Sequence, residues 1–253
     1  MMNNMNHIRN ALLVSVALLL GACSATPELE ADAVEPKLPM PAPPADPDEK
    51  GISYSNDPWE GFNRRSYYFN AKADEYVILP IVNGYQWITP DIVETGVSNF
   101  FSNLGELTTF MNSVLQLKGE RSATTAFRFV TNTTIGLLGV WDPATKMGVY
   151  KEREDFGQTL GHWGVGAGPY FVIPLLGPSS ARDASGLLVD TLVFNAIISE
   201  LDMKSEEELA LTLMRAIDTR KNIPFRYYGS GSAFEYELMR FLYFNAREIA
   251  VKR

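Results

Sequence analysis

The sequence predicts a mainly α protein in which a single helical domain follows an unstructured leader. Three observations predict this class. Several long stretches carry apolar residues at helical spacing. No two-residue hairpin signal occurs between alternating apolar and polar runs. The exception to regular structure is residues 155–186, where glycine and proline are too dense for ordinary helices or strands.

The first 22 residues are typical of a secretory signal, with a basic head, a short apolar run and small residues at its end. The only cysteine of the chain, Cys23, follows directly. The run Leu20-Gly21-Ala22-Cys23 resembles a bacterial lipobox, which implies that Cys23 becomes the acylated first residue of the mature chain. Several acyl chains, at ~0.8 kcal/mol per buried methylene, make a durable membrane anchor. The alternative is a plain signal peptide followed by a free cysteine.

The residue after the cysteine is Ser24 rather than aspartate. By the bacterial sorting rule that the lipobox resemblance implies, we expect a lipid-anchored protein of the Gram-negative outer membrane that faces the periplasm. Residues 24–57 hold eight acidic and two basic side chains and many prolines. Residues 23–56 therefore predict a lipidated cysteine with an extended, disordered tether. Residues 58–253 keep a net charge of only about −3, so nothing favours nucleic-acid binding.

The folded domain is predicted over residues 57–253. Asp57 is the predicted N-cap of its first helix, with Pro58 at the first helical position, and Pro80 and Pro90 are expected to interrupt the chain. Further helices are predicted over residues 91–118 (one or two helices), 122–140, 183–201, from Ser205 onward and over 235–252. Their apolar stripes are most simply the core faces of ordinary helices.

Three of these stretches carry more specific signals. Gly136 and Gly139 either end the helix that contains them or allow a close approach by another backbone. Residues 183–201 are apolar on so many sides that we expect this helix to be buried on most sides or partly in lipid. The run from Ser205 to Glu208 has the form of a capping box, which predicts a helix start.

The segment 155–186 combines its glycines and prolines with apolar side chains, among them Trp163, Tyr170 and Phe171. It is too apolar for a solvated linker. Irregular backbone with an apolar surface must be buried in protein, line a cavity or meet lipid. This stretch is therefore the first candidate for a functional surface.

The mature chain predicts no enzyme, no metal and no cofactor. Its one histidine is His162, which excludes histidine and cysteine clusters of the kind that bind zinc. No G-x-S-x-G, H-E-x-x-H or Walker sequence occurs. Carboxylates that could do acid–base work are Glu152, Glu154, Asp155 and Asp183. Because Arg153 and Arg182 are available as ion-pair partners, hydrolysis remains a minority alternative.

Three motifs, in order behind the lipobox, resemble the MlaA (VacJ) family over about residues 57–198. The first is the run Asp57-Pro58-Trp59-Glu60-Gly61-Phe62-Asn63-Arg64. The second is a helix end with Phe129, Asn132, Gly136, Gly139 and Asp142. The third runs from Phe156-Gly157-Gln158-Thr159-Leu160-Gly161 through Gly168-Pro169-Tyr170, Pro174 and Gly177 to Arg182-Asp183.

This resemblance implies an outer-membrane lipoprotein that maintains lipid asymmetry. Its helices would form a ring embedded in the inner leaflet, around an amphipathic channel and beside a trimeric porin. Misplaced phospholipids of the outer leaflet would enter this channel and pass to a soluble periplasmic carrier. An inner-membrane ATPase complex would then complete the intermembrane transfer.

The resemblance also implies site residues. A loop that controls passage corresponds most closely to Phe69 and Asn70. The residues expected at the channel wall or rim are Gly161, Trp163, Gly164, Gly166, Gly168, Pro169, Tyr170 and Arg182. Two alternatives remain open: a structural lipoprotein that only docks on a porin, and a periplasmic hydrolase that uses aspartate or glutamate side chains.

Overall fold

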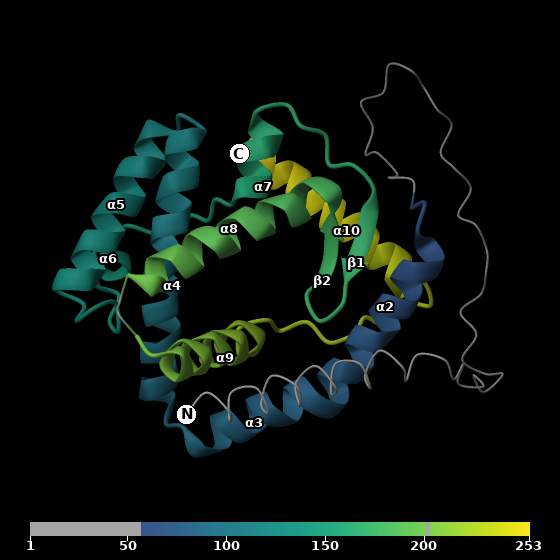
Figure 1. Cartoon of the computed structure of the whole chain (residues 1–253), viewed down its shortest axis with the longest axis horizontal. Coiled ribbons are helices and arrows are strands. Elements are labelled where there is room, and N and C mark those ends of the chain that lie inside the picture. The colour runs from purple at the N-terminus through teal and green to yellow at the C-terminus, as the bar shows by residue number, and fades with distance from the viewer. Residues whose placement is uncertain (1–56, 201–202) are drawn as a thin grey trace, which may run out of the picture. The chain divides into compact units, whose positions relative to one another are not determined.

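The computed structural model describes residues 57–200 and 203–253. All of them belong to one compact unit. Helices make up most of this part of the chain (Figure 1), which confirms the mainly α prediction. The predicted signal peptide, Cys23 and the tether lie outside the described residues, so those predictions stay predictions.

The domain opens with a helix that does not stop at the predicted proline. Helix α2 (Glu60–Ala73) continues through η3 (Asp74–Ile78) into α3 (Leu79–Ile88). The expectation that Pro80 interrupts the chain is therefore wrong. Proline lacks an N–H and its ring crowds the carbonyl four residues earlier. The carbonyl concerned belongs to Tyr76, inside η3, where the π-helical turn has shifted the backbone bonds to wider i→i+5 spacing.

The predicted N-cap is also displaced. Trp59, not Asp57, is the residue that precedes helix α2, and its side chain makes no cap. Asp57 acts from farther out, where its Oδ1 accepts hydrogen bonds from Trp59 N at 3.2 Å and Asn63 Nδ2 at 2.7 Å. Asp57 therefore still accepts hydrogen bonds from donors at the start of α2, although it is not the N-cap residue.

Helices α4 (Asp91–Leu115) and α5 (Gly119–Thr134) pack against each other, and the short α6 (Pro143–Lys146) packs on α5. The stretch 91–118 thus contains one helix, which ends at Leu115. Helix α5 is shorter than predicted because the chain turns at its glycines. A Cβ on Gly136 would lie 2.4 Å from Trp141 O, and Gly139 has φ +88°. Both predicted roles of the glycines are confirmed.

The central segment is more regular than predicted. It contains helix α7 (Phe156–His162) and an antiparallel hairpin of β1 (Tyr170–Ile173) and β2 (Gly177–Ser180). Sequence patterns do not predict this hairpin, because its turn uses Leu175 at φ +66°, a conformation normally taken by glycine or asparagine. Only the connection between α7 and β1 is irregular, together with the hairpin turn.

Three helices complete the domain: α8 (Ala181–Ser199), α9 (Ser205–Lys221) and α10 (Glu235–Lys252). The last one has the predicted bounds. The capping interaction of α9 is shifted by one residue from the predicted Ser205–Glu208 box, because the Glu207 carboxylate accepts from Lys204 N at 2.9 Å.

Polar side chains attach α2 to the hairpin. Asn63, Ser66 and Asn70 share one face of the helix, at spacings of three and four residues. Asn63 Nδ2 donates to Tyr170 O at 3.1 Å, and Asn63 Oδ1 accepts from Val172 N at 2.8 Å. Ser66 Oγ donates to Val172 O at 2.7 Å. These three residues, the α2 clip, bind a strand edge that would otherwise be open.

The elements follow one another in a closed circuit (Figure 1). Helix α2 contacts β1, β2 contacts α8 and α10, α7 packs on α8 and α10, and α4 contacts α7, α8 and α9. Helix α9 also contacts α3, which returns the circuit to α2. A small aromatic core lies where α2, the hairpin and α10 meet, with Tyr67, Tyr170, Val172 and Tyr236.

Candidate functional site

The buried residues of α4 and α5 are largely polar, and many apolar side chains of the helices are exposed. On α8, Leu188 and Leu192 are 62% and 60% exposed. The buried residues of α4 are Glu94, Gly96, Phe101, Asn103, Glu106, Thr109, Asn112 and Ser113. The expectation that the apolar stripes are core faces is therefore wrong for α4. Of the two alternatives for α8, burial by protein on most sides is wrong, and partial burial in lipid stays a prediction.

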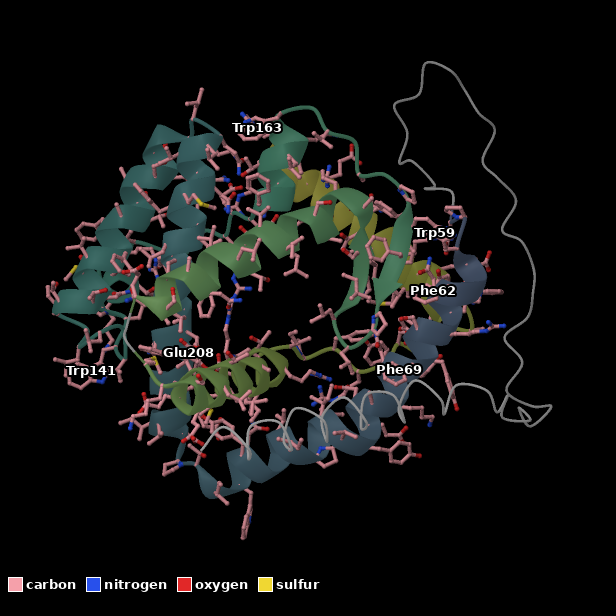
Figure 2. The ribbon with its side chains drawn as sticks, in the orientation of Figure 1. Trp59, Phe62, Phe69, Trp141, Trp163 and Glu208 are labelled. Carbon is pink, nitrogen blue, oxygen red and sulfur yellow. The ribbon has the colours of Figure 1, made fainter. Side chains whose placement is uncertain are left out.

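All four tryptophans of the chain are exposed: Trp59, Trp87, Trp141 and Trp163. They come from elements far apart in the sequence. Trp59, Trp141 and Trp163 lie at three separate places on the outer edge of the view in Figure 2. Tryptophan prefers the boundary between apolar and polar surroundings, so this edge has the composition of an interfacial surface.

A buried ion network joins α4 to α5 and α6. The Arg128 side chain donates from Nε to Glu106 at 2.8 Å and from Nη2 to Asp142 at 3.1 Å. Burial raises the pKa of Glu106, although Arg128 opposes this change. Burial also acts on Asp142, but hydrogen bonds from Thr145 and Arg128 outweigh it and lower the pKa of that carboxyl. The network is an internal strut that ties α4 to α5 and α6.

A second network joins α7, α8 and α10. Arg247 contacts Asp155 at 2.6 and 2.8 Å and Asp183 at 2.9 and 3.0 Å. Arg182 Nε and Tyr243 Oη also donate to Asp183, at 3.0 and 2.5 Å. Burial opposes ionisation, but these donors prevail and lower the pKa of Asp183 to about 2. The pKa of Asp155 is lowered for the same reason.

The predicted rim residues divide into two groups. Trp163, Gly164, Gly166 and Gly168 are exposed in the α7–β1 connection, where Trp163 Nε1 donates to Leu115 O at 3.1 Å. The glycines at 164 and 168 have φ values of +89° and +72°, which explains their residue type. In contrast, a Cβ on Gly161 would lie 2.7 Å from Val251, so that glycine serves the contact with α10. Pro169 is half-buried, and its carbonyl accepts from Ala181 N at 3.1 Å.

Two of the predicted rim residues make structural contacts. Tyr170 is fully buried in the aromatic core, with its ring 6.1 Å from that of Tyr236, so its placement on a channel wall or rim is wrong. Arg182 lies at the start of α8, where it pairs with Asp183 and its backbone N donates to Ala167 O. Its guanidinium is engaged by Asp183, and its place at the rim stays a prediction.

Phe69 and Asn70 lie in the last turns of helix α2 and not in a loop. Phe69 is 48% exposed, whereas Asn70 is buried. Asn70 Nδ2 donates to Ile173 O at 3.0 Å, and Asn70 Oδ1 accepts from Leu175 N at 2.6 Å. Asn70 therefore extends the α2 clip to the hairpin turn, directly before the π-helical turn η3.

Sequence reasoning missed two further features. The hairpin turn presents Leu175 and Leu176, which are 60% and 68% exposed. On α9, Arg215 lies with its Cζ 3.5 Å from the centre of the Phe194 ring of α8. The pair of leucines after Pro174 was a usable signal for an exposed apolar turn. A cation facing another helix left no signal in the sequence, because its partner lies 21 residues earlier in the chain.

In the part of the chain that the structure describes, no group of three or more histidine, cysteine, aspartate or glutamate side chains could hold a metal ion. None of the described helices is both long and apolar enough to cross a membrane. The site is thus a surface of exposed apolar side chains, held in shape by buried polar contacts.

Fold and site together define a mainly helical protein with polar contacts inside and apolar side chains outside. The family model described as MlaA lipoprotein matches residues 55–250 of this chain. The chain belongs to the MlaA lipoprotein family.

Individual relatives agree with this assignment. An uncharacterized protein of Rickettsia prowazekii is 34% identical over 208 residues, which cover 81% of each chain. The intermembrane phospholipid transport system lipoprotein MlaA of Escherichia coli is 37% identical over 147 residues, 56% of this chain and 57% of the relative. A solved structure concerned with the maintenance of bacterial outer membrane lipid asymmetry is 31% identical, with a TM-score of 0.65. It covers 78% of this chain and 99% of the other.

Proposed function

We propose that this protein is an outer-membrane lipoprotein that removes mislocalised phospholipids from the outer leaflet and so maintains lipid asymmetry. The observation that carries the proposal is the inverted distribution of side chains in a member of the MlaA family. The E. coli relative is named for intermembrane phospholipid transport. No covalent chemistry is needed for such a transfer.

The inverted distribution suits a domain embedded in the inner leaflet. In water, the transfer of apolar side chains into the interior drives folding, and exposed apolar area is costly. In lipid that drive between helices is absent, and helices associate through small residues and interhelical hydrogen bonds. Helix α4 buries mostly polar and small residues, while its Ile92 and Val93 are 77% and 49% exposed. An apolar solvent explains this arrangement better than water does.

The exposed tryptophans also support a domain embedded in the inner leaflet. Tryptophan collects at the level of lipid headgroups, and those on the outer edge of the domain would set its position in the leaflet. The lipidated Cys23 would hold the protein at the membrane, with the tether giving the domain freedom to settle there. A trimeric porin beside the domain and a periplasmic carrier below it complete the proposed route.

The rival function, hydrolysis, requires a carboxyl that can donate a proton near neutral pH. The carboxylates of Asp155 and Asp183 instead accept hydrogen bonds from Arg247, and the pKa of Asp183 is lowered to about 2. Glu154 is buried and paired with Lys118 at 3.0 Å. These carboxylates serve as structural anions, so the geometry favours transport over acid–base catalysis.

The decisive test is the lipid that the full-length lipoprotein carries. Purified in mild detergent, it should retain phospholipid that mass spectrometry detects in stoichiometric amounts. Deletion of the gene should raise the phospholipid exposed at the cell surface. A lipid-free protein whose deletion leaves surface phospholipid unchanged would contradict transport and favour a porin-docking role. Release of free fatty acid or lysophospholipid from pure phospholipid would favour the hydrolase.

We also propose that Phe69 and Asn70 control passage, through the hairpin that Asn70 holds. Asn70→Ala removes the acceptor of the part-buried Leu175 N–H, a loss of about 0.5–1.5 kcal/mol. The turn should then move more freely, and surface phospholipid and sensitivity to detergent with chelator should rise in cells. Asn70→Asp, which keeps the acceptor, should show a smaller effect. Equal surface phospholipid in wild type and Asn70→Ala, at matched protein levels, would remove Asn70 from the gate.

A further inference from the structure

We propose that Arg215 of helix α9 binds the phosphate group of the transported phospholipid. The inference rests on the proposed function and deepens it by assigning the headgroup a specific cation. Helix α9 lies beyond the portion of the chain that the sequence motifs covered, which ended at about residue 198.

Arg215 differs from the other half-buried or buried arginines of the described residues. Each of the others has a carboxylate within 4.0 Å: Arg64, Arg121, Arg128, Arg182, Arg220, Arg240 and Arg247. Arg215 is half-buried, and among residues 57–200 and 203–253 it has no such partner. A guanidinium withdrawn from water requires an anion or a set of acceptors.

Within residues 57–200 and 203–253, the guanidinium of Arg215 lies over an aromatic ring. Its Cζ stacks 3.5 Å from the centre of the Phe194 ring, and Phe194 is itself 4% exposed. Burial alone accounts for a lowered pKa of Arg215, with no carboxylate to offset it. Stacking on an aromatic ring fixes the guanidinium plane and leaves its N–H groups free for a second partner.

The surroundings suit a two-tailed lipid. Leu187, Leu188 and Leu192 are exposed on α8, the helix that carries Phe194, and Leu209 and Leu213 are exposed on α9, the helix that carries Arg215. The cation therefore lies where two helices meet, each of which exposes apolar side chains elsewhere on its surface. A phosphodiester accepts the paired hydrogen bonds of a guanidinium, while the leucines on the other faces of the two helices offer the acyl chains a surface.

Neighbouring acidic groups leave Arg215 available. Asp218 is held by Lys221 at 3.8 Å and by Asn222 Nδ2 at 3.2 Å. Glu208, labelled on α9 in Figure 2, is seven residues before Arg215. That spacing places it two turns away, about 10 Å along the helix axis, which is too far for an ion pair with Arg215.

The test compares lipid binding by full-length variants in detergent. The probes are phosphatidylethanolamine, diacylglycerol without a headgroup, and glycerophosphoethanolamine without tails. Arg215→Gln should lower the retention of phosphatidylethanolamine about 10- to 100-fold, since a charge-assisted hydrogen bond of this kind supports that range. Retention of diacylglycerol should not change. Arg215→Lys, which keeps the charge and loses the planar fork, should fall between.

Arg65→Gln is the matched control, because Arg65 is exposed on α2 and the substitution removes the same charge. It should bind lipid like the wild type. Equal loss of phosphatidylethanolamine and diacylglycerol in Arg215→Gln would mean a structural role and overturn the inference. Binding of glycerophosphoethanolamine as tight as that of the lipid would overturn it too. If the wild type retains no phospholipid, the proposed function itself fails. If the wild type retains phosphatidylethanolamine and Arg215→Gln retains it equally well, the inference alone fails.

Discussion

Replacing Arg128 by methionine is expected to lower the free energy of unfolding by about 3–5 kcal/mol, because it leaves two carboxylates without their partner. The Arg128 side chain is 2% exposed, and the Glu106 side chain is 0% exposed. The same guanidinium also donates to Thr145 Oγ1 and Val149 O. The measurement is the midpoint of chemical unfolding in detergent, followed by circular dichroism.

A double variant separates loss of the ion pair from loss of packing. Arg128→Met combined with Glu106→Gln removes the charge that the single variant strands, and should recover a large part of the lost stability. Arg153→Met is the surface control, since Arg153 is exposed, and should change stability by less than about 0.5 kcal/mol. If the single variant unfolds like the wild type, the network is not an internal strut.

Replacing Gly186 by valine is expected to separate helix α8 from α7. Even a Cβ at this position would lie 2.2 Å from Gly157 N and 2.7 Å from Gly157 Cα, and backbone atoms cannot give way as a flexible side chain can. Overpacking of this kind typically costs about 1–3 kcal/mol and more where backbone must shift. The unfolding midpoint should drop, and phospholipid retention should fall with it because α8 carries the exposed leucines.

Gly84→Ala is the control for this contact. Gly84 also lies inside a helix, but nothing stands within 4 Å of the position that its Cβ would take. Alanine there should keep or raise stability by about 0.5–1 kcal/mol, since it restricts the unfolded chain. Equal unfolding midpoints for Gly186→Val and the wild type would show that α7 and α8 do not meet as closely as described.

Much of the fold could be predicted from local patterns. The bounds of α10 and the single helix over most of residues 91–118 follow from apolar spacing, which depends only on helix geometry. The end of α5 follows from Gly136 and Gly139, because the lack of a Cβ is a local property. The hairpin could not be predicted, since Leu175 holds a conformation that its residue type does not favour.

The site was harder to predict because partners meet from distant parts of the chain. Tyr170 was expected at a rim as an exposed aromatic, but α2 and α10 enclose it. Arg182 was expected to face a channel, and it also pairs with Asp183. Conversely, Arg215 gave no local sign of the aromatic ring on which it stacks.

The sequence by itself determined the helical class, the motifs and, through those motifs, the family. Only the tertiary structure decided what those residues do: Asn63 bonds to β1, and Asn132 donates to Asp142 at 3.0 Å. It also decided that α4 buries mainly its polar residues and exposes much of its apolar stripe. Periodicity reveals that a helix has two faces, but which face is buried depends on the hydrogen-bond partners and the solvent that tertiary structure brings to it.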